Sequence, residues 1–191
     1  MKQFIDLEDI QSVPKLIRDA ISLKKNPFQF EHLGKHKTIG MLFFNSSLRT
    51  RLSTQKAAQN LGMQTMIMNL NQDGWSLEFQ DGSTMNGNTA EHIKEAAAVV
   101  SQYVDIIALR AFPSLTDKKS DEEELIIKSF QKYALAPIVN MESATAHPLQ
   151  AVADAITIFE FQQKKRPKVV LSWAPHPRAL PHAVPNSFTK M

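Results

Sequence analysis

The sequence contains no cysteine among its 191 residues. Disulfide bonds, thiolate nucleophiles and cysteine-based zinc sites are therefore excluded. It has no apolar run approaching the ~20 residues that a helix needs to cross a bilayer. The first nine residues include Asp6, Glu8 and Asp9 and lack a long apolar stretch, so we expect no signal peptide. These absences predict a soluble, cytoplasmic protein with no membrane partner.

The chain also lacks a strong excess of charge of either sign. It has 22 Lys and Arg residues against 19 Asp and Glu residues, a net charge of +3, with no long basic block. This balance gives no reason to expect nucleic acid as a partner and is compatible with a small anionic ligand. The patterns G-x-x-x-x-G-K-[ST] and G-x-G-x-x-G are absent, which excludes a P-loop and argues against a dinucleotide site.

Apolar segments alternate with helical patterns along the chain. This alternation is typical of an α/β fold, so we predict a doubly wound parallel sheet with helices on both faces. The sequence divides into a first domain at residues 1–147 and a helix followed by the beginning of a second α/β domain at residues 148–191. Strands are expected at 38–44, 63–70, 104–109, 137–141 and 168–173, and helices at 12–24, 49–61, 91–103, 121–134 and 148–164.

Residues 45–51, Asn-Ser-Ser-Leu-Arg-Thr-Arg, lie between the first of these strands and a helix. The free backbone N–H groups and the dipole of a helix N-terminus attract anions. Ser47 and Thr50 add hydroxyl donors, and Arg49 and Arg51 add guanidinium donors suited to phosphate. This stretch predicts a phosphate site, although a capped helix with surface arginines is the alternative interpretation.

Polar side chains also follow two later strands. Arg110 comes after residues 104–109, and Glu142 and His147 come after residues 137–141. Ligands of open α/β sheets bind beyond the carboxyl ends of the strands, so we expect these groups near residues 45–51. Each also has a structural alternative: a surface charge for Arg110, and a helix cap for Glu142 and His147.

Three stretches together resemble the aspartate/ornithine carbamoyltransferase family: residues 45–51, the His147-Pro-Leu-Gln150 turn, and residues 173–178 with 183–187. The last stretch is similar to the branch that uses N-acylated ornithine. The resemblance implies a carbamoyl phosphate-binding domain at 1–147 and the beginning of an acylornithine-binding domain at 148–191. The family's His-Cys-Leu-Pro turn is absent, so the chain is expected to be truncated.

The resemblance implies transfer of a carbamoyl group from carbamoyl phosphate to the δ-amine of N-succinylornithine in arginine biosynthesis, with no cofactor and no metal. It implies a homotrimer in which Trp75, from the long loop 71–90, reaches the site of a neighbouring subunit. The alternative is that Trp75 anchors its own loop by packing on the core of its own chain. The residues implied in catalysis are Arg110, His147 and Thr50. Carbamoyl phosphate would be bound by Ser47, Leu48, Arg49, Thr50, Trp75, Arg110, His147 and Gln150, and the acylornithine by Glu142, His176, Arg178 and Ala90.

The acceptor depends on the residue before Glu91-His92, which lies near the acyl group in members of this branch. Ala90 is small and uncharged and would neither crowd nor repel a succinyl carboxylate, which favours N-succinylornithine over N-acetylornithine. Two other interpretations stay open. In one, the chain is a truncated protein that binds carbamoyl phosphate weakly or not at all and catalyses nothing. In the other, it is a regulatory or assembly subunit that contributes Trp75 to the site of a full-length partner.

Overall fold

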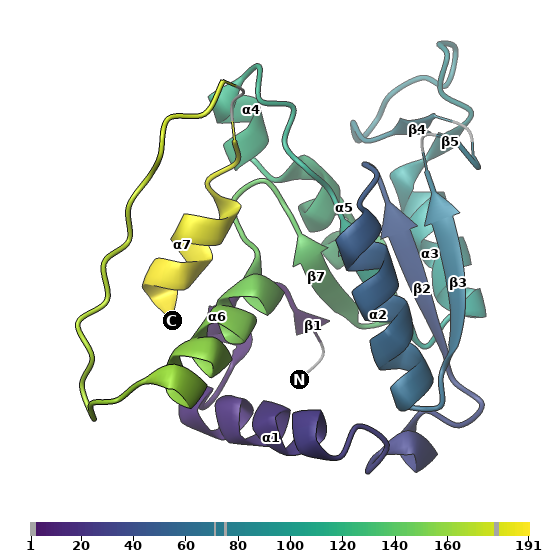
Figure 1. Cartoon of the computed structure of the whole chain (residues 1–191). Coiled ribbons are helices and arrows are strands. Elements are labelled where there is room, and N and C mark those ends of the chain that lie inside the picture. Colours follow the sequence, from purple (N-terminus) through teal and green to yellow (C-terminus); the bar gives the residue numbers. More distant parts are fainter. Residues whose placement is uncertain (1–2, 71, 75, 178–179) are drawn as a thin grey trace.

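A computed structural model describes residues 3–70, 72–74, 76–177 and 180–191. Its core is a five-stranded parallel sheet with the strand order β1-β7-β6-β2-β3, so the predicted fold class is confirmed (Figure 1). The carboxyl ends of the strands lie along one edge, at the top in Figure 1. The strands are β1 (Gln3–Phe4), β2 (Thr38–Phe43), β3 (Gln64–Asn69), β6 (Ile106–Arg110) and β7 (Ile138–Glu142).

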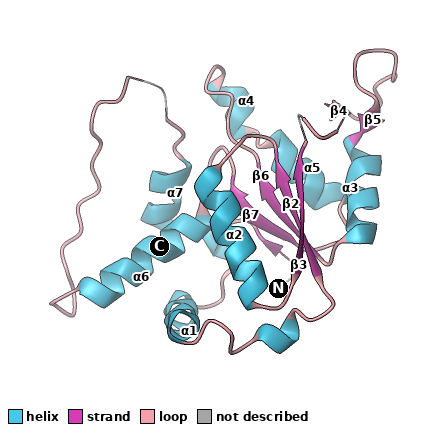
Figure 2. Ribbon diagram, turned by 45° about the vertical axis from the view of Figure 1, so that its right-hand side comes forward, coloured by secondary structure: helices cyan, strands magenta, loops and turns pink. Residues whose placement is uncertain are grey.

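Helices cover both faces of this sheet (Figure 2). On one face, Met41, Phe43 and Met141 pack with Ala58 of α2 (Leu48–Asn60). On the other face, Leu42 and Leu109 pack with residues of α3 (Ile93–Tyr103) and α5 (Leu125–Tyr133). Because β2 is buried on both sides, its sequence is an almost continuous apolar run rather than an alternating one.

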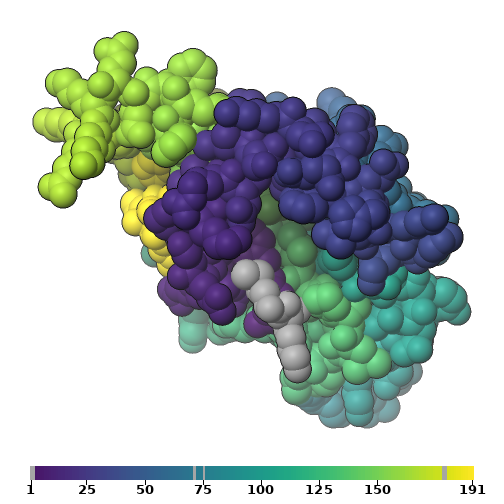
Figure 3. Space-filling model, turned by 90° about the horizontal axis from the view of Figure 1, so that it is seen from below, coloured from purple at the N-terminus to yellow at the C-terminus, as the bar shows by residue number. Residues whose placement is uncertain are grey.

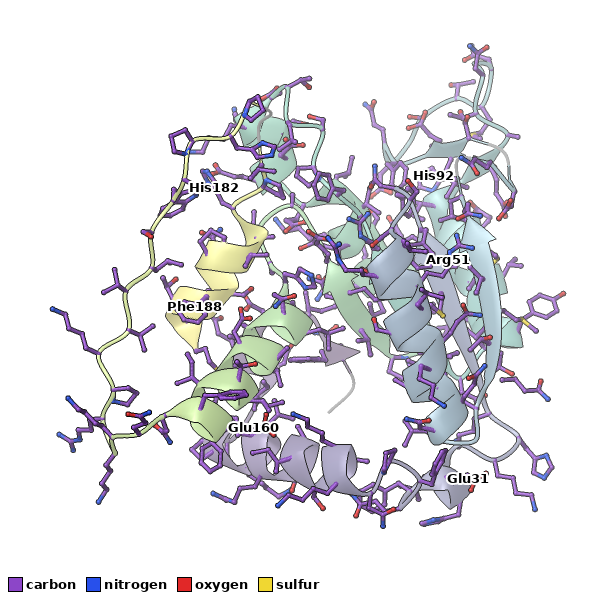
Figure 4. The ribbon with its side chains drawn as sticks, viewed as in Figure 1. Glu31, Arg51, His92, Glu160, His182 and Phe188 are labelled. Atoms are coloured by element: carbon purple, nitrogen blue, oxygen red, sulfur yellow. The ribbon has the colours of Figure 1, made fainter. Side chains whose placement is uncertain are left out.

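Three further helices lie at the side of β7. Helix α6 (Pro148–Phe161) packs on β7 and on α1 (Val13–Lys25), and α7 (Ala183–Lys190) packs on α6. Near the end of α6, Glu160 forms an ion pair with Lys24 of α1 at 2.7 Å (Figure 4). Two 3₁₀ helices, η1 (Leu7–Asp9) and η2 (Glu31–Leu33), lie in the connections before and after α1. Among the described helices, none combines the length and apolar character needed to cross a membrane.

The helix ends follow the expected sequence signals. Ser12 caps α1, its hydroxyl accepting from the backbone of Lys15 at 3.4 Å, and Pro14 lies in the first turn. Gly62 follows α2 with a φ of +73°, and a Cβ at this position would lie 2.5 Å from the carbonyl oxygen of Glu31. Only glycine fits this left-handed, crowded position without strain.

The predicted strand at residues 168–173 is wrong. These residues run in an exposed, extended path and pair with no strand in the described part of the chain. The side chain of Val170 is 73% exposed, and the segment after α6 stands out from the molecule (yellow-green in Figure 3). An apolar, β-branched segment becomes a strand only when a neighbour accepts its backbone hydrogen bonds.

Three other segments differ from the prediction. The helix expected at 121–134 is divided into α4 (Lys118–Glu122) and α5, because Glu124 has a φ of +53°. The long loop 71–90 contains β4 (Leu77–Glu78), which pairs in parallel with β5 (Glu91–His92). The proline-rich ending contains α7, which the sequence analysis did not predict.

Candidate active site

Polar side chains gather where β2, β6 and β7, neighbours in the sheet, end at the same edge. They surround a cavity of about 730 Å³ between the start of α2 and the helices α6 and α7. Of the residues predicted to bind carbamoyl phosphate, the lining includes Ser47, Arg49, Thr50, Arg110, His147 and Gln150. The sheet thus brings together groups that are about 100 residues apart in the sequence.

The N-terminus of α2 opens into this cavity. Ser47 is the N-cap, and its hydroxyl accepts from the backbone of Thr50 at 3.4 Å and donates to the Thr50 hydroxyl at 2.9 Å. The Thr50 hydroxyl therefore keeps its own hydrogen for a ligand. Arg49 makes no hydrogen bond or ion pair within the described part of the chain, so its guanidinium is available to an anion. Leu48 is 74% exposed and offers its backbone N–H.

Arg51 does not take part in this arrangement, unlike the sequence-based interpretation. Its guanidinium donates to the side chain of Asn69 on β3 and lies 5.0 Å from the centre of the Phe43 ring. Figure 4 shows Arg51 near the upper end of α2, beside β2 and β3. Of the four donors predicted in residues 47–51, three (Ser47, Arg49 and Thr50) line the cavity, and Arg51 instead holds the helix against the sheet.

Arg110 is buried and held in one orientation. Its Nε and Nη2 lie 3.1 and 2.9 Å from Oε2 of Glu142, and its Nη1 donates to the carbonyl oxygens of Asn45 and Ser46 at 3.1 and 3.2 Å. The guanidinium is also 5.1 Å from the centre of the Phe112 ring. Arg110 is only 7% exposed, so it is not a surface charge at a strand end. The second hydrogen on Nη2 remains for a ligand in the cavity.

His147 follows the turn after β7, and its backbone N–H donates to the Ser187 hydroxyl on α7 at 2.8 Å. Burial lowers the pKa of the His147 imidazole. The Glu142 carboxylate, 4.0 Å from Nε2, raises this pKa, and the positive charge of Arg110 lowers it. Burial prevails because the Glu142 carboxylate is already neutralised by Arg110, so the imidazole is uncharged at pH 7. Nδ1 is buried without a partner in the described structure, which favours a proton on Nε2, where it can reach the cavity.

Gln150 lies in the first turn of α6, after Pro148. Its Nε2 donates to Asp154 one turn further along the helix, at 2.8 Å. Because this bond orients the amide group, the side-chain oxygen of Gln150 is left to accept from an N–H group in the cavity. That geometry suits the amide nitrogen of a carbamoyl group.

The residues predicted for the second substrate are more dispersed. Glu142 lines the cavity, but its carboxylate is bound to Arg110. Ala90 is exposed and belongs to a separate cavity of about 690 Å³ beside β5, and His176 is exposed and is not part of the described lining of the active-site cavity. Trp75 and Arg178 lie outside the described residues.

Sequence reasoning missed part of the lining. Thr54 is one helical turn beyond Thr50, a spacing that places both on the same face of α2 and could have predicted its position. Trp173, Leu180 and Val184 cover the cavity from the segment after α6 and from α7. No periodicity in the sequence indicates this contact, because it depends on how the segment folds back.

Comparisons with known proteins identify the family of the chain. The family model for the aspartate/ornithine carbamoyltransferase carbamoyl-P binding domain matches residues 2–160. The chain is 49% identical to N-succinylornithine carbamoyltransferase of Bacteroides thetaiotaomicron over 190 residues, covering 100% of this chain and 60% of that protein. It is 39% identical to N-acetylornithine carbamoyltransferase of Xanthomonas axonopodis pv. citri, covering 98% of this chain and 55% of that one.

Solved structures of N-acetylornithine transcarbamylase are also similar to this chain. A mutant of N-acetyl-L-ornithine transcarbamylase complexed with carbamyl phosphate and N-succinyl-L-norvaline is similar with a TM-score of 0.90 and 39% identity, over 98% of this chain and 57% of that one. Acetylornithine transcarbamylase complexed with acetylcitrulline is similar with a TM-score of 0.89 and 38% identity, over the same shares of the two chains. The chain spans about 60% of the length of the curated N-succinylornithine carbamoyltransferases that it matches. By its sequence, its fold and the residues at its strand ends, the chain belongs to the aspartate/ornithine carbamoyltransferase family.

Proposed function

We propose that this chain binds carbamoyl phosphate in the cavity between α2 and α6 and transfers the carbamoyl group to the δ-amine of an N-acylated ornithine, a step of arginine biosynthesis. The observation that carries the proposal is the meeting of Ser47, Arg49, Thr50, Arg110, His147 and Gln150 around one cavity. These groups match the two ends of carbamoyl phosphate, a dianionic phosphate and a planar amide.

The phosphate would lie at the N-terminus of α2. There the free backbone N–H groups, the Ser47 and Thr50 hydroxyls and the Arg49 guanidinium, which has no partner among the described residues, supply donors and positive charge. The carbamoyl oxygen would face Arg110, the Thr50 hydroxyl and Nε2 of His147. The side-chain oxygen of Gln150 would accept from the carbamoyl nitrogen.

Transfer then requires attack by the uncharged δ-amine on the carbamoyl carbon. A C–N bond forms, negative charge grows on the carbamoyl oxygen, and the C–O bond to phosphate breaks; the proton lost by the amine goes to the departing phosphate. Fixed donors aimed at that oxygen stabilise the transition state, and losing one donor typically costs roughly 3 kcal/mol. The ion pair with Glu142 and the two carbonyl contacts hold Arg110 in place before the substrate arrives.

We further propose N-succinylornithine as the acceptor and a homotrimer as the active assembly. Identity is higher to the relative named for succinylornithine, 49%, than to the one named for acetylornithine, 39%. Ala90 and the loop that carries Trp75 would complete the cavity of a neighbouring copy, since Ala90 does not line the active-site cavity of its own chain.

The test is an assay for acylcitrulline formation with both acylornithines, on a chain whose length is verified by mass spectrometry. We expect faster turnover of the succinyl compound; preference for the acetyl compound contradicts the acceptor assignment. Ala90→Glu should shift the preference ratio toward the acetyl compound about tenfold or more, because a carboxylate beside the succinyl group repels it. Ala90→Gln is the control of similar size, and an unchanged ratio in both variants excludes Ala90 from the acyl site.

A second candidate function is binding of carbamoyl phosphate without transfer. His176, which was predicted to contact the acylornithine, is exposed and is not in the described lining of the cavity, and this favours the binding function over full activity of this chain alone. This candidate predicts calorimetric binding of carbamoyl phosphate with no acylcitrulline formed. Activity that appears only after a full-length relative is added would instead indicate an assembly subunit.

A further inference from the structure

The turn of residues 143–146 carries His147 from the end of β7 to the start of α6. The turn is closed by a hydrogen bond from the backbone N–H of Ser143 to the carbonyl of Ala146, at 2.8 Å. Asn140, fully buried on β7, donates to the Ser143 hydroxyl at 3.1 Å. Both bonds lie within the turn and its own strand, so they do not fix the turn relative to the helices around it.

Asn186 of α7 donates to the carbonyl oxygen of Thr145 in this turn at 3.1 Å, and Glu124 supplies a second connection, from a different part of the chain. Its Oε1 accepts from the Ser143 hydroxyl at 2.7 Å, and from the backbone N–H and the hydroxyl of Thr145 at 2.7 and 2.6 Å. Its Oε2 lies 3.3 Å from the backbone N–H of Ala144. One carboxylate therefore holds three consecutive residues of the turn, and hydrogen bonds to a charged acceptor are stronger than those between neutral groups.

The backbone at Glu124 has an unusual conformation. Its φ of +53° and ψ of +39° are left-handed, a region that non-glycine residues seldom adopt. Glu124 occupies the N-cap position of α5, but its side chain does not cap that helix. The chain thus adopts a strained link between α4 and α5, and the side chain placed there reaches across to the turn before His147.

We propose that Glu124 is a positioning residue for carbamoyl transfer, which sets the place of His147 through the turn 143–146. This inference rests on the proposed function for its chemistry. The carboxylate of Glu124 is used by the turn and is not part of the described lining of the active-site cavity. Its loss should therefore affect only the part of the ligand that meets His147, the carbamoyl group, and not the phosphate at the start of α2.

Calorimetric titration with two probes, carbamoyl phosphate and inorganic phosphate, separates these two ends. The variants are Glu124→Ala, which removes all four hydrogen bonds, and Glu124→Gln, whose oxygen can replace Oε1. Glu124→Gly also removes the carboxylate but relieves the left-handed backbone, so it guards against loss of folding in the alanine variant. Glu123→Ala is the matched control, because the exposed Glu123 side chain makes no hydrogen bond with any described residue.

The alanine and glycine variants should bind carbamoyl phosphate about tenfold more weakly than the unmodified chain, a difference of roughly 1.4 kcal/mol. Their affinity for inorganic phosphate should stay within twofold. Glu124→Gln should recover most of the loss, and Glu123→Ala should change neither affinity. A purely structural role would instead lower both affinities together, in proportion to the fraction of unfolded chain, and that result would overturn the inference.

An NMR measurement on the free protein keeps this inference distinct from the proposed function. The imidazole resonances of His147 should shift in Glu124→Ala and Glu124→Gly and return in Glu124→Gln. Unchanged resonances in all three variants would overturn the positioning role whatever the ligand. If the unmodified chain binds carbamoyl phosphate no better than phosphate while these shifts occur, the positioning role is supported and the proposed ligand is wrong.

Discussion

The carboxyl edge of the sheet and the segment at residues 162–182 both contain family motifs, yet they differ in how their side chains are held. At the sheet edge, Arg110 contacts Glu142 and two carbonyl groups, and the backbone of His147 is bound to Ser187. In the segment, Val170 and Trp173 are 73% and 68% exposed. The difference shows that a motif acquires a defined geometry only where buried partners surround it.

Arg110→Gln should produce the largest change, because it leaves the carboxylate of Glu142 buried without its partner. We expect a loss of about 3–5 kcal/mol in the free energy of unfolding, measured by urea denaturation, and loss of carbamoyl phosphate binding. The double variant Arg110→Gln with Glu142→Gln should recover part of the stability but not the binding. Lys15→Gln breaks an exposed ion pair with Asp19 and should cost less than about 1 kcal/mol. Equal losses of unfolding free energy in Arg110→Gln and Lys15→Gln would contradict the distinction between a buried and an exposed ion pair.

The pH dependence of stability should come next in size. Because the pKa of His147 is lowered from its usual 6.5 in the folded state, the unfolded chain binds the proton more readily. The stability linked to His147 is then fully present above pH 6.5 and is lost as pH falls toward the lower, folded-state pKa. The urea midpoint of His147→Gln should fall less steeply between pH 7 and pH 5 than that of the unmodified chain. Identical slopes would show that His147 is not buried in its neutral form.

Val170→Ala should have the smallest effect, within about 0.5 kcal/mol, because its side chain is largely in solvent. Leu42→Ala, at a fully buried position in β2, should cost about 2–5 kcal/mol. Thermal or urea unfolding of the two variants checks this contrast between the sheet and the segment. A large loss from Val170→Ala would mean that the segment packs on the molecule in solution.

The sequence alone predicted four of the five strands of the main sheet, most helices and the cluster of donors at the start of α2. Continuous apolar runs at 38–44 and 104–109, the cap at Ser12 and the stop at Gly62 are local signals, and each has a local physical cause. That Ser47, Arg49 and Thr50 lie together could be predicted because they surround the N-terminus of one helix, whose free N–H groups attract anions. These features need no knowledge of distant residues.

Only the tertiary structure decided the rest. It turned Arg51 toward Asn69, paired Arg110 with Glu142, divided the helix at Glu124 and left residues 168–173 without a strand partner among the described residues. Each outcome depends on which groups from other elements are close enough to donate, accept or exclude water. Periodicity and caps are set by neighbours in the chain, whereas the orientation of a buried charge is set by neighbours in space.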